Sequence, residues 1–143
     1  MGSPVTVVMT GMVALLQADP TLGTVYSRHN VADLEVPATT VAPTAIRPRS
    51  GSEMVCGSET IMPWDVTLVV RVHTSYAGAI ADQNTAVVFA DALIDKLRAN
   101  LDAIDGAHIL DVSAEYRQSF EESDTVGAQV TVTVLTHSHY TQE

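Results

Sequence analysis

The sequence predicts an α+β fold, in which an N-terminal helix and one long central helix pack on one face of a mostly antiparallel sheet. Two segments, residues 3–20 and 84–105, repeat apolar residues at helical spacing. Other segments alternate apolar and polar residues, as strands do. The predicted order is helix, strand, a looped strand region, strand, helix, strand, strand, so helices and strands do not alternate strictly.

The composition favours protein partners. The 143 residues fit a single domain, residues 1–143, which is large enough to bury a core without a disulfide or a metal. A single cysteine allows no disulfide within the chain, which favours a reducing compartment. With 17 acidic and 7 basic residues, the net charge of −10 argues against a specific nucleic-acid surface and against anionic membranes. No apolar run approaches the ~20 residues of a membrane helix.

The first element is an N-terminal helix. Ser3 can cap it, and Pro4 suits its first position, where the missing N–H does no harm. The apolar stripe consists of Val5, Val8, Met9, Met12, Leu15 and Leu16. Pro20 ends the helix, because the residue before a proline is pushed out of the helical region. A short strand is expected next, within TLGTVYSRHNV.

Residues 35–63 predict an extended hairpin or loop arm, because they carry four prolines and two glycines. Residues 39–47 can form a strand, which Pro43 would confine to a sheet edge or a bulge. A loop of this length in a compact domain is usually functional or disordered. Arg47 and Arg49, two of only seven basic residues, lie in this arm. They are either solvated or they pair with the carboxylates of a neighbouring protein.

The stretch WDVTLVVRVHT, residues 64–74, predicts a central strand with two unlike faces. One face is wholly apolar, and we expect it to pack on the long helix; its residues are Trp64, Val66, Leu68, Val70 and Val72. The other face is mixed: Asp65, Thr67, Val69, Arg71 and His73. This mixed face can look at water, at its own chain or at another protein.

The long helix is predicted over residues 84–105, with Gly106 just after its end. Its apolar stripe is Val87, Ala90, Ile94, Leu97, Leu101 and Ile104. Two antiparallel strands follow, separated by an acidic turn with Glu121, Glu122 and Asp124. We expect Leu110, Val112, Ala114, Tyr116, Val130, Val132 and Val134 to point inward, and Gln129, Thr131, Thr133 and Leu135 to point outward. The predicted core is Trp64, Leu68, Val70, Val87, Ile94, Leu97, Leu101 and Val132.

The chain offers little chemistry, so we expect no enzyme and no catalytic, cofactor-binding or metal-binding residues. It has neither a glycine-rich phosphate loop nor a nucleophile elbow. Cys56 stands alone in a Gly/Ser loop, which favours an incidental role. His137 and His139 could begin a metal site with His73, although exposed histidines at a strand end explain them better. Asp91, Asp95 and Asp102 fit a solvated helix face, and His29 and His108 fit ordinary surface or half-buried positions.

These elements in this order resemble the tail terminator (tail completion) proteins of long-tailed bacteriophages. Members of that family begin with a helix, carry an extended hairpin or loop before a central strand, and continue with a long helix and two antiparallel strands. The similar stretches cover nearly the whole chain: PVTVVMTGMVALLQ, the 35–63 arm, WDVTLVVRVHT, TAVVFADALIDKLRANLDAI, AHILDVSAEYR and AQVTVTVLTH. The resemblance is one of arrangement and includes no catalytic or ligand motif.

The resemblance implies a structural virion protein of the tail or neck, assembled in the host cytoplasm. Such proteins form a ring, usually a hexamer, that binds the tail tube protein, ends tube polymerisation and joins the head–tail connector. The mixed face with Thr67, Val69 and Arg71 would then pack on the next subunit or line the ring, and the arm with Arg47 and Arg49 would reach the tube or a neighbour. An acidic lumen would let DNA pass without binding it.

Three other functions stay open. A related neck protein, such as a stopper or adaptor, has a similar arrangement. A small ligand-binding domain or enzyme could place a pocket between the mixed face and the 35–63 loop, with Asp65, Arg71 and His73 as its polar groups. An adaptor domain could instead add the 39–47 strand to the sheet of a partner.

Overall fold

The computed structural model describes residues 4–29, 31, 35–49, 54–56, 59–76, 83–104, 106–120 and 125–141. It confirms the α+β fold class and the predicted order of elements. The helices are α1 (Pro4–Gln17), the short 3-10 helix η1 (Pro20–Leu22) and α2 (Gln83–Ala99). The strands are β1 (Thr24–Tyr26), β2 (Ala38–Pro48), β3 (Met54–Cys56), β4 (Glu59–Tyr76), β5 (Ala107–Phe120) and β6 (Thr125–Thr141).

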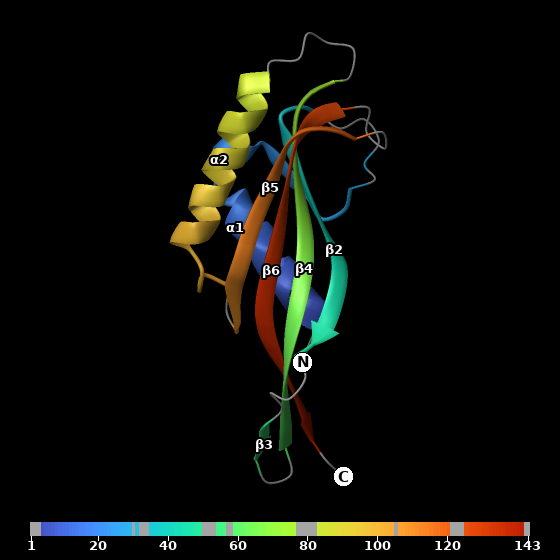
Figure 1. Cartoon of the computed structure of the whole chain (residues 1–143), viewed down its shortest axis with the longest axis vertical. Helices are drawn as coiled ribbons and strands as arrows, with labels where there is room; N and C mark the ends of the chain where they lie inside the picture. Colours follow the sequence, from blue (N-terminus) through green and yellow to red (C-terminus); the bar gives the residue numbers. More distant parts are fainter. Residues whose placement is uncertain are drawn as a thin grey trace.

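The strands form one sheet in the order β1-β2-β4-β6-β5, with β3 paired to the start of β4. All pairings are antiparallel except β1 with β2, which is parallel. The two longest strands, β4 and β6, lie side by side at the centre and pair from Glu59↔Thr141 to Tyr76↔Thr125. This long antiparallel ladder is the frame on which the other strands and both helices are placed (Figure 1).

Both helices cover the same face of the sheet, where α1 crosses behind the strands and α2 runs beside β5 (Figure 1). The core lies between the helices and this face, and its central side chains are fully buried: Val8, Met12, Leu16, Val66, Leu68, Val70, Val72, Leu93, Leu97, Val130, Val132 and Val134. The apolar residues of β4 and β6 alternate with polar ones, so burial against the helices fixes the register of this ladder. The apolar face of the central strand therefore packs on both helices, where the sequence predicts only the long one.

The predicted arm over residues 35–63 is mostly strand. Here β2 extends to Pro48, and β4 begins at Glu59. The ladder of β2 with β4 is irregular between Pro43 and Ala45, which is one of the two outcomes expected from Pro43. Since β1 pairs only with residues 38–40, the rest of β2 is also a sheet edge. On the N-terminal side of Trp64, at residues 59–63 of β4, the sheet narrows to a ribbon of β3, the start of β4 and the end of β6 (Figure 1).

The long helix is shorter than predicted: it ends at Ala99, whereas the sequence predicts a helix to residue 105. The side-chain amide of Asn100 donates to the Lys96 carbonyl at 2.7 Å, and the Asn100 backbone N–H donates to the Leu97 carbonyl. Asparagine is a residue that commonly ends helices in this way. The prediction that Leu101 belongs to the core is therefore wrong. Leu101 lies past the end of the helix and is 37% exposed.

The predicted inward set of β5 is wrong at its start. The pairing of β5 with β6 shifts between Ile109 and Asp111, so Leu110 is the extra residue of a bulge. Ile109 therefore takes the buried position, and Leu110 is 39% exposed. Trp64 also departs from the predicted core: it is half-buried, and its indole N–H donates to the Ser138 hydroxyl on β6.

Candidate functional site

The face of the sheet opposite the helices, here called the open face, carries the mixed residues of the central strand. Its middle rows pair Thr67 with Thr133 and Val69 with Thr131, and all four side chains are half-buried. In the described part of the chain, neither helix and no further strand lies over these rows (Figure 1). The middle of the open face is thus a surface of small hydroxyl-bearing and aliphatic side chains.

One end of the open face is closed around His73, which is fully buried. Its Nε2 atom lies 2.8 Å from the Thr40 hydroxyl on β2, and its Nδ1 atom lies 2.6 Å from the Thr125 hydroxyl on β6. The Thr40 hydroxyl is also 2.9 Å from Nδ1 of His29. A hydroxyl can donate one hydrogen bond and accept others, so it can satisfy a neutral imidazole on either side. His73 therefore ties β2, β4 and β6 together.

The same end of the open face contains a ring contact and a cation contact. The Phe120 ring, at the end of β5, lies 4.8 Å from the His73 ring between centroids. The Arg71 guanidinium lies 4.9 Å from the Phe120 ring centroid, and its Nε–H donates to the Gln129 side-chain oxygen at 3.3 Å. His73 is fully buried and Arg71 is half-buried, so the contacts of this cluster hold the ends of β4, β5 and β6 together.

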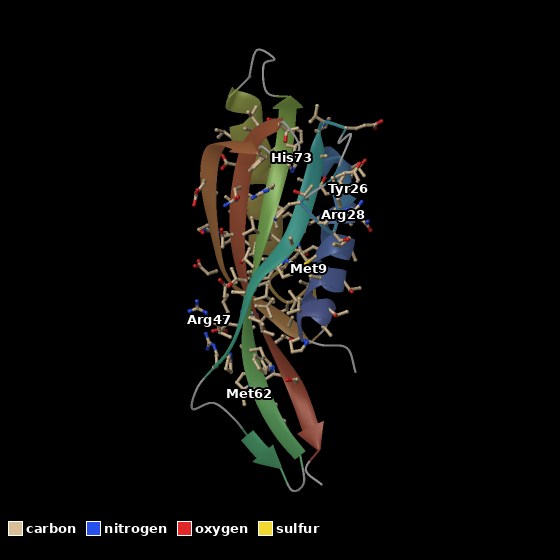
Figure 2. The ribbon with its side chains drawn as sticks, turned by 90° about the vertical axis from the view of Figure 1, so that its right-hand side faces the viewer. Met9, Tyr26, Arg28, Arg47, Met62 and His73 are labelled. Atoms are coloured by element: carbon tan, nitrogen blue, oxygen red, sulfur yellow. The ribbon has the colours of Figure 1, made fainter. Side chains whose placement is uncertain are left out.

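The predicted interface residues lie on the open face or at its β2 edge. Thr67, Val69 and Arg71 point to the open face from β4. Arg47 lies on β2 opposite Asp65, toward the other end of the sheet from His73 (Figure 2). Arg49 Nε donates to the Asp65 carboxylate at 2.8 Å. The arginine pair of the arm is thus fixed beside the sheet, and one of its two charges is neutralised within the chain.

The histidines do not meet at a metal site. His73 pairs with Gly127, whereas His137 pairs with Pro63, ten residues earlier on β4. At about 3.3 Å per residue, His73 and His137 are about 33 Å apart. Within the described residues, no group of three or more His, Cys, Asp and Glu side chains could hold a metal ion. The side chains of Cys56 and His139, and the acidic turn of Glu121, Glu122 and Asp124, lie outside the described residues.

The three aspartates predicted on a solvated helix face are all exposed. Asp91 and Asp95 lie on α2. Asp102 lies after the helix and contacts the His108 ring, and both groups reach solvent.

Two surface features were not predicted from the sequence. The bulge turns Leu110 outward at the free edge of β5, and Ile46 is 38% exposed at the free edge of β2. The second feature is α1, which contains no charged residue, so its outer side exposes Val7 and Thr10 beside a hollow of about 370 Å³. The missing charges could have been read from the sequence, since a surface helix usually has a charged side.

Neither helix of the described part has the length and apolar character needed to span a bilayer. No protein-family model matches the chain, and a search of curated proteins finds no significant match.

Proposed function

We propose that this protein is a structural subunit of a bacteriophage neck, which forms a ring at the head-proximal end of the tail. As a tail terminator it would end polymerisation of the tail tube and provide the joint to the head–tail connector. The observation that carries the proposal is a sheet that, within the described residues, is covered by helices on one face only, in an order of elements that resembles this family. A subunit that must meet several partners needs such uncovered surfaces.

The open face suits a ring in two ways. Its middle rows are small threonine and valine side chains, with Arg71 and Asp65 toward its ends, so the rows carry no charge that would hold a phosphate. The net charge of −10 of each subunit would also make the ring as a whole repel DNA, because like charges repel. The open face can therefore line the ring without a specific nucleic-acid contact.

The narrow ribbon beyond Trp64 gives the subunit its reach. Residues 59–63 of β4 pair with residues 137–141 of β6 on one side and with β3 on the other. This ribbon extends away from the two helices (Figure 1). We assign it to contact with the tail tube, because a paired ribbon can extend from the core without losing its backbone hydrogen bonds.

The partners that follow from this function are other copies of the chain, in a hexameric ring, the tail tube protein and the connector or stopper protein. The location is the virion tail or neck, after assembly in the host cytoplasm. A stopper or adaptor of the same neck is the second candidate. It would bind the connector but not the tube, so retention by purified tail tubes separates the two.

The test is the solution mass of the purified chain by light scattering over a concentration series, with negative-stain images of any large species. We expect closed rings, and we expect isolated tail tubes incubated with the protein to carry a cap at one end and to stop growing. Tubes that continue to polymerise at both ends in excess protein would refute the terminator function.

The ribbon is tested by replacing residues 50–62 with Asn-Gly. Arg49 and Pro63 already share a backbone hydrogen bond, so a tight two-residue turn can join them. We expect this variant to remain folded by circular dichroism and to lose the cap on tail tubes. A variant that still caps tubes would remove the ribbon from the tube contact.

A further inference from the structure

The sheet has two free edges with different chemistry. Among the described residues, β5 bonds to β6 alone, and β2 bonds to β4 alone from Val41 onward. A free edge offers unpaired backbone N–H and C=O groups to another chain. Natural proteins usually block such edges, so the side chains displayed at each edge indicate whether pairing is avoided or used.

The β2 edge presents an apolar side chain followed by cations. Ile46 is 38% exposed, and Arg47 beside it is exposed as well. Arg49 comes two residues later, after Pro48, and pairs with Asp65. Arg47 has no ion pair within the described residues, so its charge is available to a partner.

The β5 edge presents a hollow that is lined by both apolar and charged side chains. The hollow has a volume of about 430 Å³ and is lined by Arg98, Leu101, His108, Ile109, Leu110, Asp111 and Val112. Leu101 and Leu110 are 37% and 39% exposed there. Asp111 is exposed and faces solvent at the free side of the strand, and Asp102 lies next to His108. Arg98 is a cation in the same lining, and it lies on α2.

The exposed side chains of the two edges lie at the same position along the strands. Across the strands, one row runs from Ile46 through Val66 and Val134 to Ile109, directly beside the bulged Leu110. A second row runs from Ala45 through Thr67 and Thr133 to Asp111. The exposed isoleucine of one edge and the hollow of the other are therefore at equal height along the strands.

The equal position of the two edges along the strands decides whether a head-to-tail assembly can close into a ring. A head-to-tail contact joins two different surfaces of the same molecule, and it closes into a ring only if successive copies do not climb along the axis. A rotation about an axis along the strands, without a rise, brings Ile46 of one copy to Leu101 and Leu110 of the next. In that placement β2 and β5 run antiparallel, as neighbouring strands of this sheet do.

We propose that copies of this chain join through these edges, with Ile46 of one copy in the hollow beside Leu110 of the next. Arg47 lies in the row of His108, two residues along the strand from the row of Asp111, so its long side chain pairs diagonally with Asp111 of the next copy. The inference rests on the ring function proposed above and names the contact that builds the ring. An apolar centre with charged pairs at its border is the usual anatomy of a specific interface. The opposite charges also exclude contact between two identical edges, since Arg47 would then meet Arg47.

The test is charge reversal at each edge. We expect Arg47→Asp alone and Asp111→Arg alone to weaken self-association at least tenfold by light scattering, because each places like charges across every contact. The double variant should regain assembly. An equimolar mixture of the two single variants should also assemble, because an alternating ring restores an opposite pair at every contact.

Two control variants test whether the change in net charge alone, or a loss of the fold, explains a loss of assembly. Arg28→Asp and Asp95→Arg make the same charge changes at exposed positions: Arg28 follows β1 toward the His73 end of the sheet, far from Arg47 (Figure 2), and Asp95 lies on α2. We expect them to assemble like the unaltered chain, and we expect all variants to keep the melting temperature of the unaltered chain. Assembly that is unaffected by either single reversal, or a double variant as defective as the singles, would overturn the inference.

Tube capping separates this inference from the ring function. If the unaltered chain is a monomer in the absence of tubes, the same variants are compared for their ability to cap tail tubes. Loss of capping in the single variants, with recovery of capping in the double variant, supports the edge contact. Capping by all variants alike overturns the contact and leaves the terminator function standing. Rings that respond to the reversals without capping tubes support the contact and remove the terminator function. A chain that neither associates nor caps overturns both.

Discussion

The two faces of β4 differ although they alternate residue by residue along one strand. Val66, Leu68 and Val70 are fully buried against the helices, whereas Thr67 and Val69 on the open face remain half-exposed. The same backbone thus supplies the core on one side and a surface on the other. The difference teaches that stability and assembly can be altered separately in this protein, by choosing residues one position apart.

The largest effect is expected from a charge on the covered side. Leu97 of α2 is fully buried in the core, so Leu97→Asp would place an unpaired carboxylate there. We expect a loss of about 4 kcal/mol or more, enough to abolish cooperative unfolding in many domains of this size. Urea denaturation followed by circular dichroism measures it.

The control for this variant is Val88→Asp on the same helix. Val88 is 65% exposed, so the same charge should change the stability by only about 0.5 kcal/mol. Equal losses in the two variants would contradict the assignment of the covered face.

A second large effect is expected where Gly127 of β6 lies against the backbone of β4. A Cβ atom added at Gly127 would lie 1.8 Å from the Val72 carbonyl oxygen, so Gly127→Ala forces the two backbones apart. We expect a loss of about 3 kcal/mol by overpacking. Differential scanning calorimetry would show it as a lowered melting temperature.

Gly106→Ala provides the contrast. Gly106 has open space around it but a φ of 74°, so the cost there is backbone strain alone, about 1 kcal/mol. If Gly127→Ala were the milder of the two changes, the close pairing of β4 and β6 at this point would be wrong.

An intermediate effect is expected at the closed end of the open face. His73→Leu keeps a buried side chain but removes the hydrogen bonds to Thr40 and Thr125. Each buried hydrogen bond contributes about 0.5–1.5 kcal/mol net, so we expect a loss of about 2 kcal/mol from the two together. Equilibrium unfolding of the single variants and of His73→Leu with Thr125→Val forms a double-mutant cycle. The paired change should cost less than the sum of its parts, and strict additivity would mean that the hydrogen bond contributes nothing.

Much of this fold could be predicted because its signals are local. The period-two pattern of residues 128–135 and the helical pattern of residues 4–17 depend only on neighbouring residues. The unlike faces of the central strand could be read in the same way. Thr67, Val69 and Arg71 therefore lie on the uncovered side, as the alternation requires.

The rest depends on contacts between distant parts of the chain. Leu110 points outward only because of a bulge against β6, and no residue type in β5 announces it. The burial of His73 needs Thr40, Thr125 and Phe120, which come from three other strands. The two free edges also require the strand order, which a single sequence does not contain. These contacts between residues far apart in the sequence decide which surfaces are available to partners.

The smallest effects give the sharpest comparison of the two faces, through opposite substitutions at adjacent residues. Val66→Thr places a hydroxyl in the core, and we expect it to cost about 1–2 kcal/mol. Thr67→Val removes a hydroxyl from the half-exposed open face, and we expect a change within about 0.5 kcal/mol. Chemical denaturation of both variants at a concentration where the chain is monomeric measures the difference. A clear gain in stability from Thr67→Val, as large as the loss from Val66→Thr, would mean that the open face is itself buried by another part of the chain, because only a dry surface rewards the loss of a hydroxyl so strongly.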